Sequence, residues 1–182
     1  MISHLGADYT PHQPLLLVVG AAGAGKSTLV EALAGTIEGA LILDADMFAD
    51  DLVTVVSPRH DYPEHWRALM RYAFEIGRNG QAVVYCGVML PEQLLAHAEE
   101  LAWFDGVHFL VLVCDDDELR ERVMARPGRE RPKAAIEMHL EFNRRFRDEH
   151  TRTPNTTVID ASRVFDDVKG DVAAWIRRVL AG

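Results

Sequence analysis

The stretch Gly20–Thr28 reads GAAGAGKST and contains the residue types that bind phosphate groups. Its glycines permit backbone torsions closed to other residues, so amide N–H groups can approach phosphate oxygens. Lys26 has the reach to contact outer phosphates, and the Ser27 hydroxyl can bind Mg²⁺. The stretch follows an apolar run and precedes a helical pattern, a context that disfavours the alternative of a flexible Gly/Ala turn. The sequence therefore predicts a nucleotide-binding loop formed by Gly20, Ala21, Ala22, Gly23, Ala24, Gly25, Lys26, Ser27 and Thr28.

Two carboxylates form a second candidate group in the stretch LILDADMF, where Asp44 and Asp46 follow a short apolar run. The carboxyl ends of parallel strands line the ligand crevice of an open α/β sheet. A carboxylate there can hold Mg²⁺ through water, the role predicted for Asp44. It can also accept a proton from an attacking hydroxyl, the role predicted for Asp46. The structural alternative for this pair is an N-cap of the next helix.

Arginines dominate a third stretch, LRERVMARPGRERPK. Arg122 and Arg126 are four residues apart and so share a helix face, and Arg129 and Arg131 follow in a segment interrupted by proline and glycine. Guanidinium groups stack on rings and grip phosphates, so a cationic lid would stabilise transferring charge and exclude water. The alternative is a solvated charged helix, since glutamates are interleaved among the arginines.

Short apolar runs alternate with helical patterns along the chain. The runs are too short for buried helices and predict strands covered on both faces, at Leu15–Val19, Ala40–Leu43, Ala82–Cys86, Val107–Cys114 and Thr157–Ile159. Helices are predicted at Lys26–Ala34, 63–80, Pro91–Leu101, Asp116–Arg126, Ala134–His150 and Asp166–Leu180. Because parallel strands need crossovers, the pattern predicts an α/β fold, a three-layer αβα sandwich with a parallel sheet of about five strands. We expect one domain over residues 1–182.

Composition and charge limit the classes of partner. The 182 residues are 48% hydrophobic and carry a formal net charge of -9, which disfavours a nucleic-acid or anionic-membrane surface. The two cysteines, Cys86 and Cys114, end apolar runs and are interpreted as small buried hydrophobes. We expect a cytoplasmic protein, because no signal-peptide pattern or membrane-length apolar run occurs. The eight histidines lack metal-ligand spacing, so Mg²⁺ carried with ATP is the metal predicted.

The motif order resembles that of the small P-loop kinases, the group that includes nucleoside monophosphate, shikimate, gluconate and adenylylsulfate kinases. The resemblance rests on GAAGAGKST (the Walker A pattern), on Asp46 and on LRERVMAR. It implies a P-loop NTPase fold with a helical lid over residues 127–150, an acceptor oriented by Asp46, and Arg122 stacked on the adenine. It also implies that Arg126 contacts ATP phosphates. A loop over the adenine is implied near Asp160, Ser162 and Arg163.

Acceptor recognition is assigned to the region between the acids and the third strand. In HDYPEHWRALM, Arg67 is a candidate clamp for an anionic acceptor, Tyr62 a candidate for ring stacking, and Trp66 a core residue. Gly87 would permit close backbone approach to a ligand, and Arg129 and Arg131 are further substrate candidates. The segments DYPEHWRAL and GVMLPEQ also resemble tunicamycin-resistance P-loop proteins, which implies a resistance or detoxification role.

These residues predict an ATP- and Mg²⁺-dependent kinase that phosphorylates a hydroxyl of a small molecule, namely a nucleoside, a nucleoside-like antibiotic or a sugar-like compound. A nucleoside monophosphate kinase is the alternative within the enzymes, and a nucleotide-binding regulatory or resistance protein with little turnover is the alternative outside them. A motor ATPase is disfavoured because the run AVVYC ends without an acid. The chain lacks the Asn-Lys-x-Asp guanine signature, which favours ATP over GTP. The acceptor, the pathway and the oligomeric state, a homodimer included, stay open.

Overall fold

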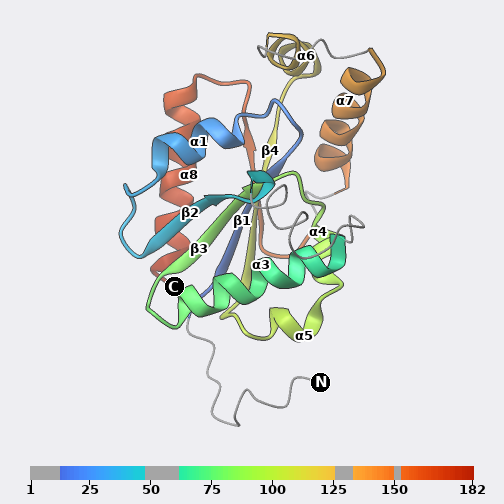
Figure 1. The fold of residues 1–182 in the computed structure, drawn as a ribbon. Helices are drawn as coiled ribbons and strands as arrows, with labels where there is room; N and C mark the ends of the chain where they lie inside the picture. The colour runs from blue at the N-terminus through green and yellow to red at the C-terminus, as the bar shows by residue number, and fades with distance from the viewer. Residues whose placement is uncertain (1–12, 48–61, 126–132, 150–152) are drawn as a thin grey trace.

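The computed structural model describes residues 13–47, 62–125, 133–149 and 153–182. Five strands, all paired in parallel, form one sheet in the order β2-β3-β1-β4-β5 (Figure 1). Their bounds are Leu15–Gly20 for β1, Ala40–Asp44 for β2, Ala82–Gly87 for β3, Val107–Val113 for β4 and Thr156–Asp160 for β5. This is the α/β fold of the P-loop NTPases, and the predicted parallel sheet is confirmed.

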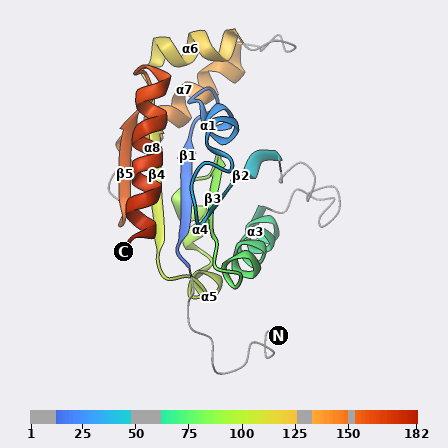
Figure 2. The same cartoon turned by 90° about the vertical axis from the view of Figure 1, so that its left-hand side faces the viewer.

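Helices cover both faces of the sheet (Figures 1 and 2). One face carries α1 and α8, the other carries α3, and α6 lies beyond the phosphate loop with α7 next to it. The helix bounds are Lys26–Leu33 for α1, Tyr62–Gly77 for α3, Pro91–Leu95 for α4, Ala98–Leu101 for α5, Asp116–Met124 for α6, Lys133–Asp148 for α7 and Phe165–Leu180 for α8. Among the described residues, no helix is long and apolar enough to cross a membrane.

The central strand β1 shows why the apolar runs become strands. All its residues are buried, and successive side chains point to opposite faces of the sheet. Leu16 and Val18 pack in the cluster that includes Ile176 of α8. Leu17 packs in the other cluster, with Leu69 of α3. A continuous apolar sequence is therefore required, because both faces of β1 lie in a core.

The strand register brings the loops that follow the strands to one edge of the sheet. Val19 of β1 pairs with Gly87 of β3, and Gly20 lies opposite Leu112 of β4. On β2, Asp44 pairs with Cys86 of β3. The phosphate loop, the acidic pair and the turn after β3 therefore begin at the same edge, the usual ligand edge of such folds.

The predicted continuous helix Pro91–Leu101 is wrong, since α4 ends at Leu95 and α5 begins at Ala98. His97 leaves the helical region with φ -101° and ψ 53°. The side chains of His97 and Glu100 are buried beside the break, and Glu100 accepts a hydrogen bond from Arg67 of α3 at 2.6 Å. An ion pair between buried Glu100 and half-exposed Arg67 of another helix therefore accompanies the break, and local helix periodicity does not reveal such a long-range contact.

A buried amide attaches α7 to the end of β4. Asn143 is fully buried, its Nδ2 donates to the Cys114 carbonyl at 2.7 Å, and its Oδ1 accepts from the Cys114 N–H at 3.1 Å. The same Nδ2 lies 3.2 Å from Oδ1 of Asp116. On the same helix, Arg144 donates to the Asp116 carboxylate and Arg147 donates to the Cys114 carbonyl. Asn143 therefore completes the backbone pairing of Cys114 as a neighbouring strand would.

We predict that Asn143→Ala lowers the free energy of unfolding by about 2–4 kcal/mol, because it leaves the buried Cys114 N–H without its acceptor and opens a cavity. Urea unfolding followed by circular dichroism measures the change. Glu141→Ala, at an exposed position on the same helix, is the control and should change stability by no more than about 0.5 kcal/mol. Equal losses in the two variants would contradict the role given to Asn143.

Candidate active site

The phosphate loop runs from the end of β1 into α1 and is held against α6. Gly23 and Gly25 have φ values of 97° and 95°, in the left-handed region that favours glycine. A Cβ atom on Gly23 would lie 2.8 Å from Cγ2 of Val123 and 3.0 Å from Cδ1 of Leu119, both on α6. Gly23 is thus required for its torsion and for its close approach to α6.

Lys26, the first residue of α1, is folded back onto the loop. Its side chain is buried, and Nζ donates to the carbonyl oxygens of Gly20 at 2.8 Å and Ala21 at 3.0 Å. The next residues, Ser27 and Thr28, are exposed in the first turn of α1. A positive charge and hydroxyl groups therefore lie at the loop, as binding of nucleotide phosphates with Mg²⁺ requires.

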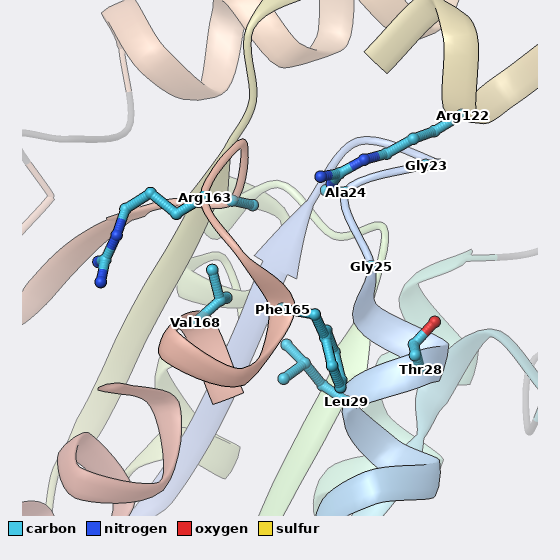
Figure 3. Close-up of a pocket in the computed structure, with 10 residues that line it drawn as sticks. Gly23, Ala24, Gly25, Thr28, Leu29, Arg122, Arg163, Phe165 and Val168 are labelled. Carbon is cyan, nitrogen blue, oxygen red and sulfur yellow. The ribbon is translucent and has the colours of Figure 1, made fainter. Parts of the chain in front are cut away.

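A cavity of about 360 Å³ lies beside the loop (Figure 3). Its lining comes from the loop, α1, α6 and the segment from β5 into α8, and consists of Gly23, Ala24, Gly25, Thr28, Leu29, Arg122, Ala161, Arg163, Phe165 and Val168. Leu29, Phe165 and Val168 make one wall apolar, whereas Arg122 supplies a planar cation. The volume lies in the range of small-ligand pockets, and such a lining suits a flat aromatic base.

Two of the predicted base-site arginines lie at this cavity in different orientations. The Arg122 side chain extends from α6 toward the loop at Ala24, and its Nε donates to Glu118 at 2.8 Å (Figure 3). The Arg163 guanidinium points away from the loop and bonds to Asp171 of α8 at 2.6 Å. Of the two, Arg122 has the orientation to cover a base.

Asp160 and Ser162, also predicted at the base site, shape the loop between β5 and α8. Oδ1 of Asp160 accepts from the Ser162 N–H at 2.9 Å. The Ser162 hydroxyl accepts from the Asp115 N–H at 2.7 Å, which links this loop to the end of β4. Their direct contact with a nucleotide stays a prediction.

Sequence reasoning missed the apolar wall of the cavity. Leu29 and Val168 are buried, so their periodicity indicated only core positions. Phe165 is 38% exposed, which is unusual for a large aromatic residue, and it opens α8 directly after the β5 loop. An aromatic side chain at that place was the one available signal.

Asp44 caps a helical turn at residues 45–47. Its Oδ1 accepts from the backbone N–H groups of Asp46 at 3.0 Å and Met47 at 3.2 Å. The capping interpretation is therefore confirmed for Asp44, and its contact with Mg²⁺ stays a prediction. Among the described residues, no group of three or more His, Cys, Asp or Glu side chains is arranged to hold a metal ion.

Asp46 lies across from the end of β3. Its Oδ1 accepts from the Val88 N–H at 2.9 Å. A Cβ atom on Gly87 would lie 3.0 Å from that same oxygen and 3.1 Å from Cβ of Ala45. The absence of a side chain at Gly87 thus leaves room for Asp46. Contact of either residue with an acceptor stays a prediction.

The charges of the phosphate-loop lysine and of the acidic pair after β2 both act on Cys86, near the end of β3. Burial raises the pKa of the Cys86 thiol to about 12; the positive charge of Lys26 lowers this pKa, and the negative charges of Asp44 and Asp46 raise it. The phosphate-loop lysine and both acids are therefore close enough to influence one buried atom. The structure brings these predicted residues together around β1, β2 and β3.

The first turns of α3 add a residue that sequence reasoning missed, His65. Its side chain is 5% exposed, burial lowers its pKa, and the negative charge of Asp46 partly opposes that change in pKa. The pattern of α3 predicted only apolar core positions, so His65 had no separate signal in the sequence.

The other predicted acceptor residues stand as follows. Arg67 bonds to buried Glu100 of α5, so clamping an anionic acceptor would require it to leave that partner. Tyr62 opens α3, but its side chain lies outside the described part of the structure. Arg126, Arg129 and Arg131 also lie outside the described residues, and their roles stay predictions.

The sheet order, the phosphate loop and the acids beside it define a P-loop NTPase with the fold of the small P-loop kinases. The chain belongs to the AAA domain family, whose model matches residues 15–152. No curated protein sequence shows significant similarity to the chain.

Solved structures share the fold at low sequence identity. The Deinococcus radiodurans tunicamycin resistance protein superposes with a TM-score of 0.65 at 16% identity, covering 90% of this chain and 95% of its own. A gluconokinase from Sinorhizobium meliloti gives 0.64 at 18% identity, with 94% and 96% covered. A sugar kinase from Janibacter gives 0.65 at 16% identity, with 92% and 95% covered.

We predict that Gly23→Ala weakens binding of a fluorescent ATP analogue at least about tenfold, because the new methyl group meets α6 and strains the left-handed torsion. Gly35→Ala is the matched control, since Gly35 also has a positive φ, 69°, but has open space where the new methyl group would lie. A titration of analogue fluorescence measures both variants. Equal affinities of the Gly23→Ala and Gly35→Ala variants for the analogue would show that the fit between Gly23 and α6 does not shape the nucleotide site.

We also predict that Asp46→Asn lowers the pKa of His65 further, because the carboxylate charge favours the imidazolium form. A pH titration of histidine NMR signals measures this, with His65→Asn to assign the resonance. His108 is an internal control, because burial lowers its pKa and Asp105, not Asp46, opposes that effect. An increase in the His65 pKa would contradict the proximity of the two side chains.

Proposed function

We propose that this protein is an ATP- and Mg²⁺-dependent kinase that transfers the γ-phosphate of ATP to a hydroxyl group of a small molecule. The observation that carries the proposal is the position of Asp46, which the Val88 N–H holds at the strand edge shared with the phosphate loop. A fixed carboxylate beside a phosphate loop can orient a hydroxyl and accept its proton.

The donor side would use the loop and the adjoining cavity. Lys26 would exchange its bonds to the Gly20 and Ala21 carbonyls for bonds to phosphate oxygens. The wall with Phe165 would hold the adenine against Arg122, whose guanidinium favours planar stacking. The Ser27 hydroxyl and Asp44 supply oxygen ligands of the kind that Mg²⁺ prefers. Bound with ATP, Mg²⁺ would neutralise charge that develops on the β- and γ-phosphates.

The acceptor side would use Asp46 as general base. Val88 fixes Oδ1, so the carboxylate is oriented before the acceptor arrives. The acceptor hydroxyl would give its proton to this carboxylate as its oxygen forms the new bond to phosphorus, and the bond from phosphorus to the leaving ADP oxygen would break. Such transfer depends mainly on position and charge stabilisation, which rigid strand ends provide.

A hydroxyl acceptor is favoured over a nucleoside monophosphate. A phosphate acceptor needs cations, and Arg67, the candidate clamp, is engaged by Glu100. The names of two structures with this fold, a gluconokinase and a sugar kinase, support a sugar-like acceptor. The tunicamycin resistance protein supports a nucleoside-like antibiotic and a resistance role. We further propose a cytoplasmic location, which the free, buried cysteines Cys86 and Cys114 support.

We predict that Asp46→Asn lowers kcat for acceptor phosphorylation by about 10²–10⁴-fold, because the base is lost, while binding of a fluorescent ATP analogue is retained. Lys26→Ala should lower kcat/KM by at least about 10²-fold, because it removes the positive charge that would stabilise the transferring phosphoryl group. The assay is ADP release across nucleosides, nucleotides, sugars and aminocyclitols, with mass detection of the product.

The controls are Asp105→Asn and Arg78→Ala, which alter exposed charges just before β4 and β3, at the edge of the sheet opposite the phosphate loop, and should leave turnover unchanged. Full acceptor phosphorylation by Asp46→Asn would refute the base. Tight ATP binding with no acceptor-dependent ADP release would favour a regulatory nucleotide-binding protein. Turnover of monophosphates alone would favour the nucleoside monophosphate kinase.

A further inference from the structure

Buried polar atoms without partners are concentrated at one place in the described structure. Four such side-chain atoms occur among the described residues, and three of them are Nδ1 and Nε2 of His65 and Nε1 of Trp66. Buried polar groups are normally hydrogen bonded, so each exception requires an explanation. Consecutive residues at the start of α3 therefore form an unusual group, the His65–Trp66 pair.

The His65–Trp66 pair is ordered by apolar packing. The two rings meet edge to face with centroids 5.1 Å apart and an interplanar angle of 63°. The Trp66 side chain is buried in the cluster that also contains Ala45 and Met89. Ala45 precedes Asp46, and Met89 follows the Val88 N–H that holds Asp46. The imidazole thus lies against a ring of the same core cluster that contains Ala45, the neighbour of the proposed base in the sequence.

The chemistry of this place favours an uncharged ligand group. Burial lowers the pKa of His65 below 6.5, so the imidazole is neutral near pH 7 and offers one donor and one acceptor nitrogen. A hydroxyl group matches this, since it donates once and accepts as well. The Asp46 carboxylate would repel a phosphate group, and a neutral imidazole would offer no positive charge to offset that repulsion.

We propose that His65 is an acceptor-binding residue whose imidazole hydrogen bonds to an uncharged hydroxyl group of the acceptor, next to the hydroxyl that Asp46 activates. This rests on the proposed kinase function and narrows it to polyhydroxylated acceptors, such as sugars or the ribose of nucleosides. The two unpartnered nitrogens would then hydrogen bond to the ligand. Because they are buried, an analogue that lacks the hydroxyl would leave them unpaired and would bind more weakly.

The first test replaces the imidazole. His65→Leu removes both nitrogens and should raise the KM for the acceptor at least about tenfold, while the KM for ATP changes by less than about twofold. His65→Gln keeps a donor and an acceptor and should recover most of the lost affinity. Thr156→Val is the matched control, because Thr156 carries the fourth unpartnered buried atom but lies at the start of β5, opposite Phe109.

Thermal unfolding separates binding from folding. Removal of unpartnered polar atoms should leave His65→Leu at least as stable as the wild type, so a higher KM would not reflect a damaged fold. An unchanged acceptor KM in a stable His65→Leu variant would overturn the proposal and would assign the two nitrogens to a buried water only. Equal changes in the KM values for acceptor and ATP would overturn it as well.

The second test observes His65 in the wild-type protein and does not depend on turnover. Its imidazole NMR signals, assigned with His65→Gln, are followed on adding uridine, adenosine and glucose, each compared with its monophosphate. A change with the unphosphorylated members supports the proposal, even if no ADP is released and the kinase function fails. No change with any member, or a change with the monophosphates alone, overturns it. Turnover with unchanged His65 signals would overturn the inference while leaving the kinase function intact.

Discussion

The arrangement of the site depends on the parallel pairing of β1 with β3 on one side and β4 on the other. The register places Val19 opposite Gly87 and Gly20 opposite Leu112. The approach on the β4 side is tight, since a Cβ atom on Gly20 would lie 2.7 Å from the Leu112 carbonyl oxygen. The start of the phosphate loop is therefore fixed by backbone contacts, and the side chains around it are placed relative to that fixed point.

This pairing divides the proposed site into two halves. The β4 side provides α6, the β5 loop and α8, which form the cavity beside the phosphate loop. The β3 side provides Asp46, the turn at Gly87 and, through α3, His65. Lys26 lies between them and acts electrostatically on Cys86 together with both acids. Donor and acceptor would thus approach from opposite sides of β1. At this place the connection after β1 leads to one side of the sheet, to β2, and the connection after β3 leads to the other, to β4.

The sequence predicts what depends on local pattern. The run LLLVV had to be a strand because it is apolar on both faces, and the loop at Gly20–Thr28 was recognisable because only glycine permits its torsions. Interactions between distant segments left no such pattern. Glu100 pairs with Arg67, which is 33 positions away in the sequence, and the cavity brings Leu29 of α1 together with Phe165 of α8. The sequence around His65 is that of an ordinary amphipathic helix, and only the fold brings this residue within the influence of the Asp46 charge.

The raised pKa of Cys86 has a consequence for tolerance to oxidants. Peroxides and other oxidants attack the thiolate form of cysteine, and the sulfenic acid is the first product. Because burial raises the pKa of Cys86 to about 12, this sulfur stays protonated at neutral pH although it lies near Lys26. A cysteine beside the proposed reaction centre therefore behaves as an inert packing residue, because its sulfur is held in the form that oxidants attack slowly.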